Sequence, residues 1–168
     1  MDGGALPAKL QVGVVFTPGP VGWFVRWAGL RFSHAFMRYR KPDGWWLLDA
    51  GMLGIRDHPG TGLERATDYL ILETKEPLDA ITIQRIVDYA RGNVGKPYNF
   101  WWAVLLGLKL LRRRFGFQAL AYPAYICTSY VADCFHYVGI DLVPPHRILV
   151  TPDDIAASDK LVVVEAPG

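Results

Sequence analysis

A short turn sequence, Lys-Pro-Asp-Gly, separates two segments of the chain that contain aromatic residues, 33–40 and 44–51. Proline and glycine in such a segment favour a tight reversal of the backbone, and the flanking runs contain the aromatic residues that are common in strands. Strands joined by so short a connection lie side by side and run antiparallel. The segment therefore predicts a β-hairpin and, with it, an antiparallel sheet.

Other segments predict further strands and helices around this hairpin. Short apolar runs predict strands at residues 10–16, 52–58, 68–75 and 160–165. Apolar residues at helical spacing predict helices at residues 21–30, 78–95, 97–114 and 126–137, and Thr151 is expected to cap one more. With 168 residues, 51% of them hydrophobic, the chain fits one domain with a sizeable core. The prediction is a single α+β domain over residues 1–168.

The chain contains two cysteines, Cys127 and Cys134, in the helix predicted at residues 126–137. In a helix, residues seven positions apart have Cα atoms roughly 10 Å from each other. A disulfide requires Cα atoms within about 7 Å, so these two thiols cannot pair and both are expected to be free. Cys134 falls mid-helix among apolar residues, where a thiol behaves as a small hydrophobic group.

Cys127 is the candidate nucleophile because it is expected at the helix start, where the dipole and free N–H groups favour the thiolate. A thiolate nucleophile needs an imidazole to exchange protons with it and with the leaving group. Of the four histidines, His34 lies within a predicted strand that would hold its ring in place. Asp49, on the partner strand of the hairpin, is the candidate carboxylate to orient that ring. These residues predict a catalytic triad of Cys127, His34 and Asp49.

Five segments in order, FSHAFMRY, WLLDAG, GKPYNF, YICTSYVADCFHYVGI and TPDDIAAS, resemble the permuted NlpC-type branch of the papain-like superfamily. The resemblance covers roughly residues 10 to 165. It implies a papain-like fold in which an antiparallel sheet packs against a helix carrying the cysteine at its N-terminus. It also implies that Cys127 is the nucleophile, His34 the base and Asp49 the polar third residue, with Tyr98 lining the site. Ser33, Trp101 and Tyr125 are further expected substrate contacts.

The function implied is a cysteine hydrolase, an amidase or thiol peptidase that works through a thioester intermediate, with a peptide, amide or acyl substrate such as a cell-wall peptide. Two alternatives stay open: a lipid-directed acyltransferase or esterase at a membrane surface, and a catalytically idle binding or assembly module. Zinc held by Cys127, His34 and Asp49 is a rival chemistry, since all three are zinc ligand types. No compact pair of ligands supports it, so neither a metal nor a cofactor is expected.

The net charge and the apolar runs of the chain limit which binding partners and which cellular location are expected. A net charge of +2, without one long basic stripe, gives no reason to expect nucleic acid. The first ten residues lack the pattern of a signal peptide, and the longest apolar run, residues 100–111, is too short to span a bilayer. The location expected by default is cytoplasmic. The aromatic and arginine-rich helix of residues 100–114 is also expected to form an apolar rim beside Cys127 or to touch a membrane surface.

Overall fold

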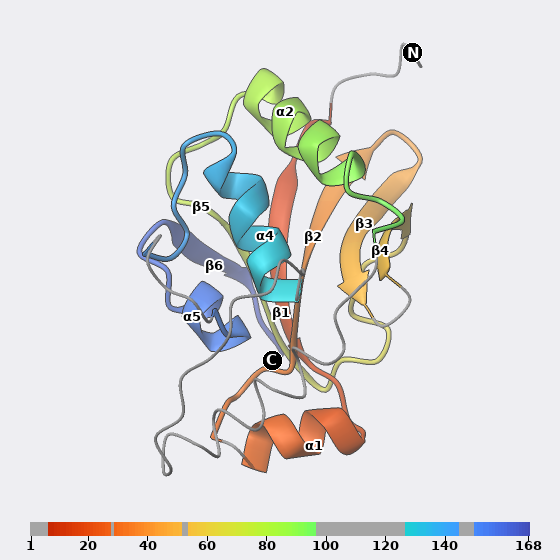
Figure 1. Cartoon of the computed structure of the whole chain (residues 1–168), viewed down its shortest axis with the longest axis vertical. Coiled ribbons are helices and arrows are strands. Elements are labelled where there is room, and N and C mark those ends of the chain that lie inside the picture. The colour runs from red at the N-terminus through yellow and green to blue at the C-terminus, as the bar shows by residue number, and fades with distance from the viewer. Residues whose placement is uncertain (1–6, 28, 52–53, 97–126, 145–149) are drawn as a thin grey trace.

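The computed structural model describes residues 7–27, 29–51, 54–96, 127–144 and 150–168, and one antiparallel sheet dominates it (Figure 1). The sheet has six strands in the order β4-β3-β2-β1-β5-β6, and every neighbouring pair runs antiparallel. The strands are β1 (Leu10–Phe16), β2 (His34–Lys41), β3 (Gly44–Gly51), β4 (Gly54–Pro59), β5 (Asp68–Thr74) and β6 (Leu161–Glu165). β1 and β2 therefore occupy the centre, and β4 and β6 form the two edges.

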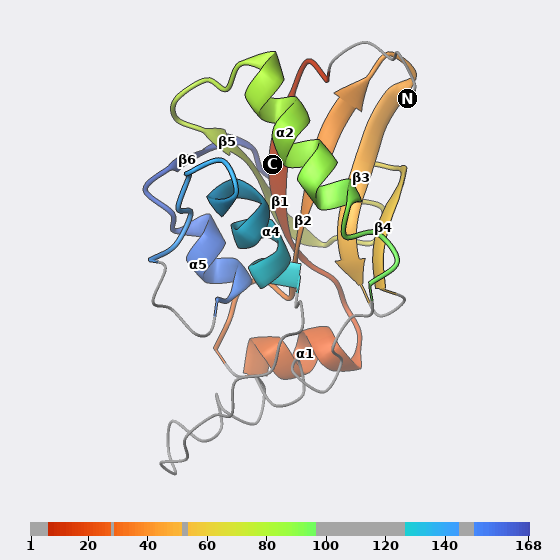
Figure 2. The same cartoon turned by 45° about the horizontal axis from the view of Figure 1, so that its top comes forward.

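Three of the four described helices lie over one face of the sheet, and the fourth lies across one end of it (Figures 1 and 2). The three are α2 (Ala80–Arg91), α4 (Cys127–His136) and α5 (Pro152–Ala156), and the fourth is α1 (Pro20–Trp27). α4 packs on β2, and α2 packs on α4. No described helix has the length and apolar character needed to cross a membrane.

Local sequence explains where these helices begin. The side chain of Asp79 accepts a hydrogen bond from the backbone N–H of Thr82 and so caps α2. At α5 the hydroxyl oxygen of Thr151 accepts from the N–H of Asp154, and the Asp154 carboxylate accepts from the N–H of Thr151. This reciprocal capping satisfies N–H groups that have no partner within the helix.

The alternation of side chains along the central strands divides the core into two parts. Ala35, Met37 and Tyr39 of β2 face the helices and belong to the larger cluster, whereas Phe36 faces the other way and packs in a smaller cluster with Val15, Leu47 and Ile71. Because successive side chains of a strand point to opposite faces, one strand supplies both clusters. Both faces of β2 are therefore buried along most of its length.

A buried polar network ties α2 to the sheet. The hydroxyl of Tyr39 donates to the carboxylate of Asp57 in β4, 3.0 Å away, and accepts from Nη2 of Arg91 at 2.6 Å. Nε of Arg91 also donates to Asp57 at 2.8 Å. Burial first, and then the charge of Asp57, raise the pKa of Tyr39, so its phenol stays protonated and can donate.

The strands, the hairpin and the helices at α2, α4 and α5 confirm the local predictions, with α1 ending earlier than expected, at Trp27. The helix predicted at residues 97–114 lies outside the described residues. The permuted papain-like, NlpC-type fold class is wrong. The described residues form mainly a continuous six-stranded sheet with few helices. The physical reason is that the order of short motifs along a chain specifies local elements but leaves the order of strands in the sheet open.

Candidate active site

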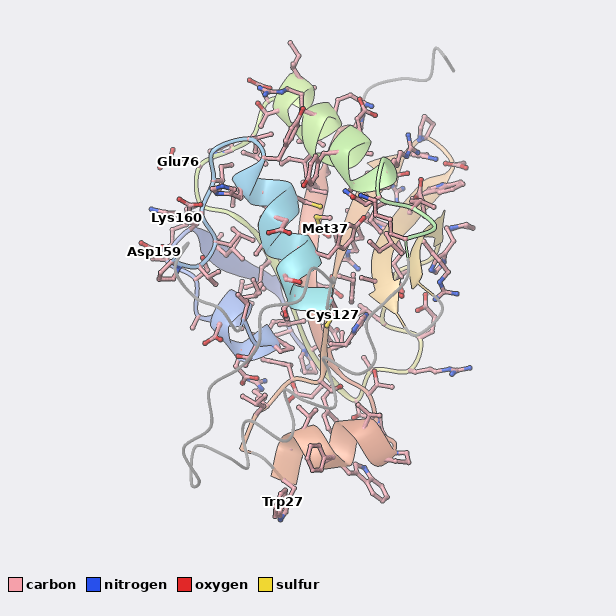
Figure 3. The ribbon with its side chains drawn as sticks, in the orientation of Figure 1. Trp27, Met37, Glu76, Cys127, Asp159 and Lys160 are labelled. Carbon is pink, nitrogen blue, oxygen red and sulfur yellow. The ribbon has the colours of Figure 1, made fainter. Side chains whose placement is uncertain are left out.

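Cys127 is the first residue of α4, at the end of that helix nearer to α1 (Figure 3). Its position is held by the next residue, because the buried hydroxyl of Thr128 donates to the carbonyl of Val150 at 2.6 Å. Cys127 is 7% exposed, whereas Cys134 is fully enclosed in the main core cluster. Both thiols are free. The helix start therefore carries the one thiol that can be reached from outside the core.

His34 begins β2, and its ring is fixed by a carboxylate from the neighbouring strand. Nε2 of His34 lies 2.6 Å from Oδ1 of Asp49 in β3. The side chain of His34 is 29% exposed and that of Asp49 is 12% exposed, so a partly open imidazole rests against an enclosed carboxylate. Because Nε2 is occupied by Asp49, Nδ1 is the ring nitrogen left for the thiol of Cys127.

Cys127 and His34 are close enough to change each other's protonation. Burial by itself would lower the pKa of His34, but the charges and hydrogen bonds of Cys127 and Asp49 outweigh it and raise that pKa to about 10. Burial would likewise raise the pKa of Cys127, yet the charge of His34 and its hydrogen bond lower it below the ordinary thiol value. The two shifts favour a thiolate next to an imidazolium at neutral pH.

Asp49 stays ionised in spite of its burial. Desolvation would raise the pKa of its carboxyl group, but the hydrogen bond and charge of His34, together with the charge of Arg56, lower it. The pKa of Cys134 moves the opposite way and rises, because burial and then the charge of Asp133 both disfavour its thiolate. The charges around the two thiols thus separate them: the pKa of Cys127 is lowered and that of Cys134 is raised.

Two groups that the sequence did not suggest complete this cluster. The backbone of Ala35 makes a hydrogen bond to the sulfur of Cys127 that favours the thiolate. Arg56 of β4 stands directly opposite Asp49 in the register, with its Nη2 3.5 Å from Oδ2 of Asp49. Arg56 could have been found from the sequence only by aligning β3 with β4 correctly, since the residue sits in no motif.

The predicted substrate contacts remain predictions. The hydroxyl of Ser33 accepts from the N–H of Thr17 at 3.1 Å and donates to the carbonyl of Val15 at 3.3 Å, which gives it a role in joining β1 to β2. Tyr98, Trp101 and Tyr125 lie outside the described residues, and so does the apolar rim expected from residues 100–114.

The other described histidines stand apart from Cys127. Nδ1 of His136 lies 2.6 Å from Oδ1 of Asp141 at the exposed end of α4. His58 of β4 pairs with Leu47 in the register, and its Nδ1 lies 3.1 Å from the carbonyl of Pro59. Among the described residues, His34 is therefore the imidazole that faces the thiol.

No protein-family model matches the chain, and no curated protein matches it. Among solved structures it is similar to the crystal structure of metalloprotein yiiX from Escherichia coli O157:H7, described as DUF1105. The match has a TM-score of 0.60 and 15% identity, and it covers 97% of this chain and 99% of the other. The likeness shows the fold alone. It replaces the NlpC-type papain-like fold inferred from motif order.

The similar solved structure is called a metalloprotein, which raises the question whether side chains of this chain could hold a metal ion. Over the part of the chain that the structure describes, no group of three or more histidine, cysteine, aspartate or glutamate side chains could hold a metal ion. Oδ1 of Asp49 is already engaged by Nε2 of His34 at 2.6 Å. The described residues therefore do not fit a metal site.

Proposed function

We propose that this chain is a cysteine-dependent hydrolase that cleaves an acyl bond through a thioester intermediate. The observation that carries the proposal is the line Asp49–His34–Cys127, in which a buried carboxylate holds one ring nitrogen and leaves the other for a thiol at a helix start. The raised pKa of His34 and the lowered pKa of Cys127 support the same assignment. Peptide amides are the first substrate class to test.

In the first half of the proposed reaction, Sγ of Cys127 attacks the substrate carbonyl carbon and a C–S bond forms. The carbonyl oxygen takes up negative charge, and N–H groups at the start of α4, including that of Cys127, can stabilise it. The bond to the leaving group then breaks, and the imidazolium of His34 gives its proton to the departing amine or alcohol. The products of this half are a thioester on Cys127 and a neutral His34.

In the second half, water attacks the thioester carbonyl while His34 accepts one of its protons. The C–S bond breaks, the acid product leaves, and the thiolate and imidazolium are restored. Asp49 keeps the ring oriented and compensates the imidazolium charge, as the carboxylate of a catalytic triad does. His34 thus acts as an acid in the first half and as a base in the second, while Asp49 orients it in both.

The proposal is tested by offering amide, ester and thioester acyl donors to the wild-type chain and to two variants, Cys127→Ala and Cys134→Ala. We expect the wild type and Cys134→Ala to release product and Cys127→Ala to release none. Intact-mass analysis should show an acyl adduct that is absent from Cys127→Ala. Equal product release by all three proteins would reject Cys127 as the nucleophile.

A lipid-directed acyltransferase or esterase is the second candidate, and α1 favours it. Trp23 and Trp27 of α1 are 66% and 69% exposed. Figure 3 shows Trp27 at the lower tip of the molecule, and Cys127 at the end of α4 that faces this tip. Exposed tryptophans on a helix suit the interface between water and lipid. The acyl-donor comparison decides between the candidates, because a lipid-directed enzyme should prefer a vesicle-borne ester to a water-soluble amide.

The idle-module and metal-binding alternatives give different results in the same experiments. An idle module would show slow, unselective alkylation of Cys127 and no acyl adduct with any donor. A metal-binding protein would carry a stoichiometric metal in elemental analysis and lose it on Cys127→Ala or His34→Ala. Either result would replace the hydrolase proposal.

A further inference from the structure

The carboxylate of Asp49 is held at both oxygens by cationic groups from the two strands that flank its own. Oδ1 lies 2.6 Å from Nε2 of His34 in β2, and Oδ2 lies 3.5 Å from Nη2 of Arg56 in β4. Asp49 is only 8% exposed, so water has little access to replace either partner. A carboxylate with a cationic partner at each oxygen cannot rotate freely, and its Oδ1 stays directed at the imidazole.

The contact between Arg56 and Asp49 lies beside Gly51, which has no side chain to crowd it. A Cβ atom at Gly51 would lie 3.2 Å from Oδ2 of Asp49 and 3.8 Å from Nη2 of Arg56. Gly51 does not adopt a positive φ angle, so its backbone conformation does not itself call for glycine, and the close approach of Asp49 is what limits a side chain there. A side chain at this position would crowd the oxygen that Arg56 contacts.

We propose that Arg56 is a positioning residue that keeps the carboxylate of Asp49 charged and aimed at His34 through the whole reaction cycle. The inference rests on the proposed function. A second cation is needed beside Asp49 because the charge of His34 changes during the reaction: the imidazolium gives up its proton to the leaving group. A guanidinium stays protonated at any pH that the protein meets. Arg56 therefore supplies a cation to Asp49 at the stage when His34 supplies none.

The groups that face Asp49 come from three elements. His34 reaches it from β2, Arg56 and His58 from β4, and Cys127 of α4 acts on it through His34. Cys127 and His34 change charge during the proposed reaction, because they exchange protons with each other and with the substrate. Arg56 is the group in this set, among the described residues, whose charge is permanent.

The test measures iodoacetamide alkylation of Cys127 in the full chain as a function of pH, followed by intact-mass analysis. Arg56→Gln removes the charge, Arg56→Lys keeps it, and Arg40→Gln is the control, because Arg40 is exposed at the far end of β2. The alkylation rate rises with pH as the thiolate of Cys127 forms, and this rise is called the acid limb of the profile. We expect Arg56→Gln to move the acid limb to higher pH. Near the midpoint of that limb the rate should fall about threefold, as for loss of a half-exposed ion pair.

Arg56→Lys should restore most of the rate, and Arg40→Gln should superimpose on the wild type. A profile unchanged in Arg56→Gln would overturn the inference, and so would an equal shift in Arg56→Lys or in Arg40→Gln. If Arg56→Gln does not fold, Gly51→Ala provides the same test, because it crowds the contact while both charges remain. We expect Gly51→Ala to shift the limb in the same direction, and no shift would count against the role of Arg56.

The wild-type profile separates this inference from the proposed function. If Cys127 in the wild type titrates as an ordinary thiol, the thiolate–imidazolium pair does not exist and the proposed function fails. If the alkylation rate of wild-type Cys127 rises at a lower pH than that of an ordinary thiol, and the Arg56 variants give the same profile, the hydrolase proposal stands and only the role of Arg56 is lost.

Discussion

Nε2 of His34 lies 2.6 Å from Oδ1 of Asp49, and this contact determines which ring nitrogen is free to face Cys127. The two residues sit on adjacent strands in a sheet whose register places Asp49 one residue beyond the Met37–Leu48 pair. A shift of the register by one residue would turn Asp49 to the other face of the sheet. The orientation of the candidate base is therefore a property of strand pairing.

Cys127 should be alkylated much faster than Cys134 at neutral pH, because its pKa is lowered by His34 while burial raises that of Cys134. His34→Gln should slow alkylation of Cys127 by at least about tenfold at pH 7, since it removes the imidazolium that stabilises the thiolate. The measurement is iodoacetamide labelling with peptide mapping, with His136→Gln as the control. Equal labelling of the two thiols in the wild type would remove the case for a poised nucleophile.

Stability should depend on pH through the same pair. The pKa of His34 rises from 6.5 to about 10 on folding, so its contribution is fully present below pH 6.5 and is lost as pH rises through about 10. The pKa of Cys127 is lowered from 9.0, so its contribution is fully present above pH 9.0 and is lost as pH falls through the folded value. Between the folded pKa of Cys127 and pH 9.0, the decline of the His34 contribution offsets the growth of the Cys127 contribution.

We therefore expect the stability contributed by the pair to form a plateau that ends near pH 9 and to fall as the pH rises from there through about 10. The measurement is urea unfolding at a series of pH values for the wild type and for the double variant Cys127→Ala with His34→Gln. The difference between the two curves should have this plateau. A difference that is constant from pH 4 to 11 would show that the two groups titrate alike in the folded and unfolded chains.

Asp57→Ala should destabilise the fold by about 2–3 kcal/mol, because it leaves the buried hydroxyl of Tyr39 without its acceptor and Arg91 without its carboxylate. Asp57 accepts from both groups, at 3.0 Å and 2.8 Å. The measurement is the free energy of unfolding in urea. Asp88→Ala is the matched control on α2, since its carboxylate accepts only from the exposed Gln84 among the hydrogen bonds described. A loss no greater than that of the control would show that the network contributes little.

Gly13→Ala should destabilise the chain by about 1–3 kcal/mol, the usual range for an overpacked core. A Cβ atom at Gly13 would lie 2.1 Å from the ring of Phe36, which is buried and whose centroid lies 6.5 Å from that of the His34 ring. Phe36→Leu in the same chain should recover part of the loss by making room, and a double-mutant cycle measures that coupling. If the stability changes of Gly13→Ala and Phe36→Leu were strictly additive, the Phe36 ring would not be the group that requires glycine at position 13.

Thr151→Ala should cost about 1 kcal/mol, because it removes the hydroxyl that caps α5. The effect should be local, as Thr151 bonds to Asp154 and not to the Cys127 cluster. Thermal unfolding measures the loss, and the alkylation rate of Cys127 should stay at the wild-type value. A changed alkylation rate would show that α5 helps to place α4.

The local elements were predictable from the sequence because they depend on residues near one another in the chain. The turn at residues 41–44 produced the hairpin, Thr151 and Pro152 began α5, and Ile83, Ile86, Val87 and Ala90 are the buried face of α2. Helical spacing also excluded a disulfide between the two cysteines, and both are free. Short-range sterics, capping and amphipathic spacing suffice for such features.

The order of the strands and the surroundings of Asp49 were decided by tertiary structure. Motif order suggested an NlpC-type papain-like fold, whereas the described residues form a six-stranded sheet in the order β4-β3-β2-β1-β5-β6. Arg56 reached Asp49 only through the pairing of β3 with β4, and Ala35 reached Cys127 only because α4 packs on β2. The physical reason is that pKa values and contacts depend on distances in space. Strand register and helix packing set these distances between residues that lie far apart in the chain.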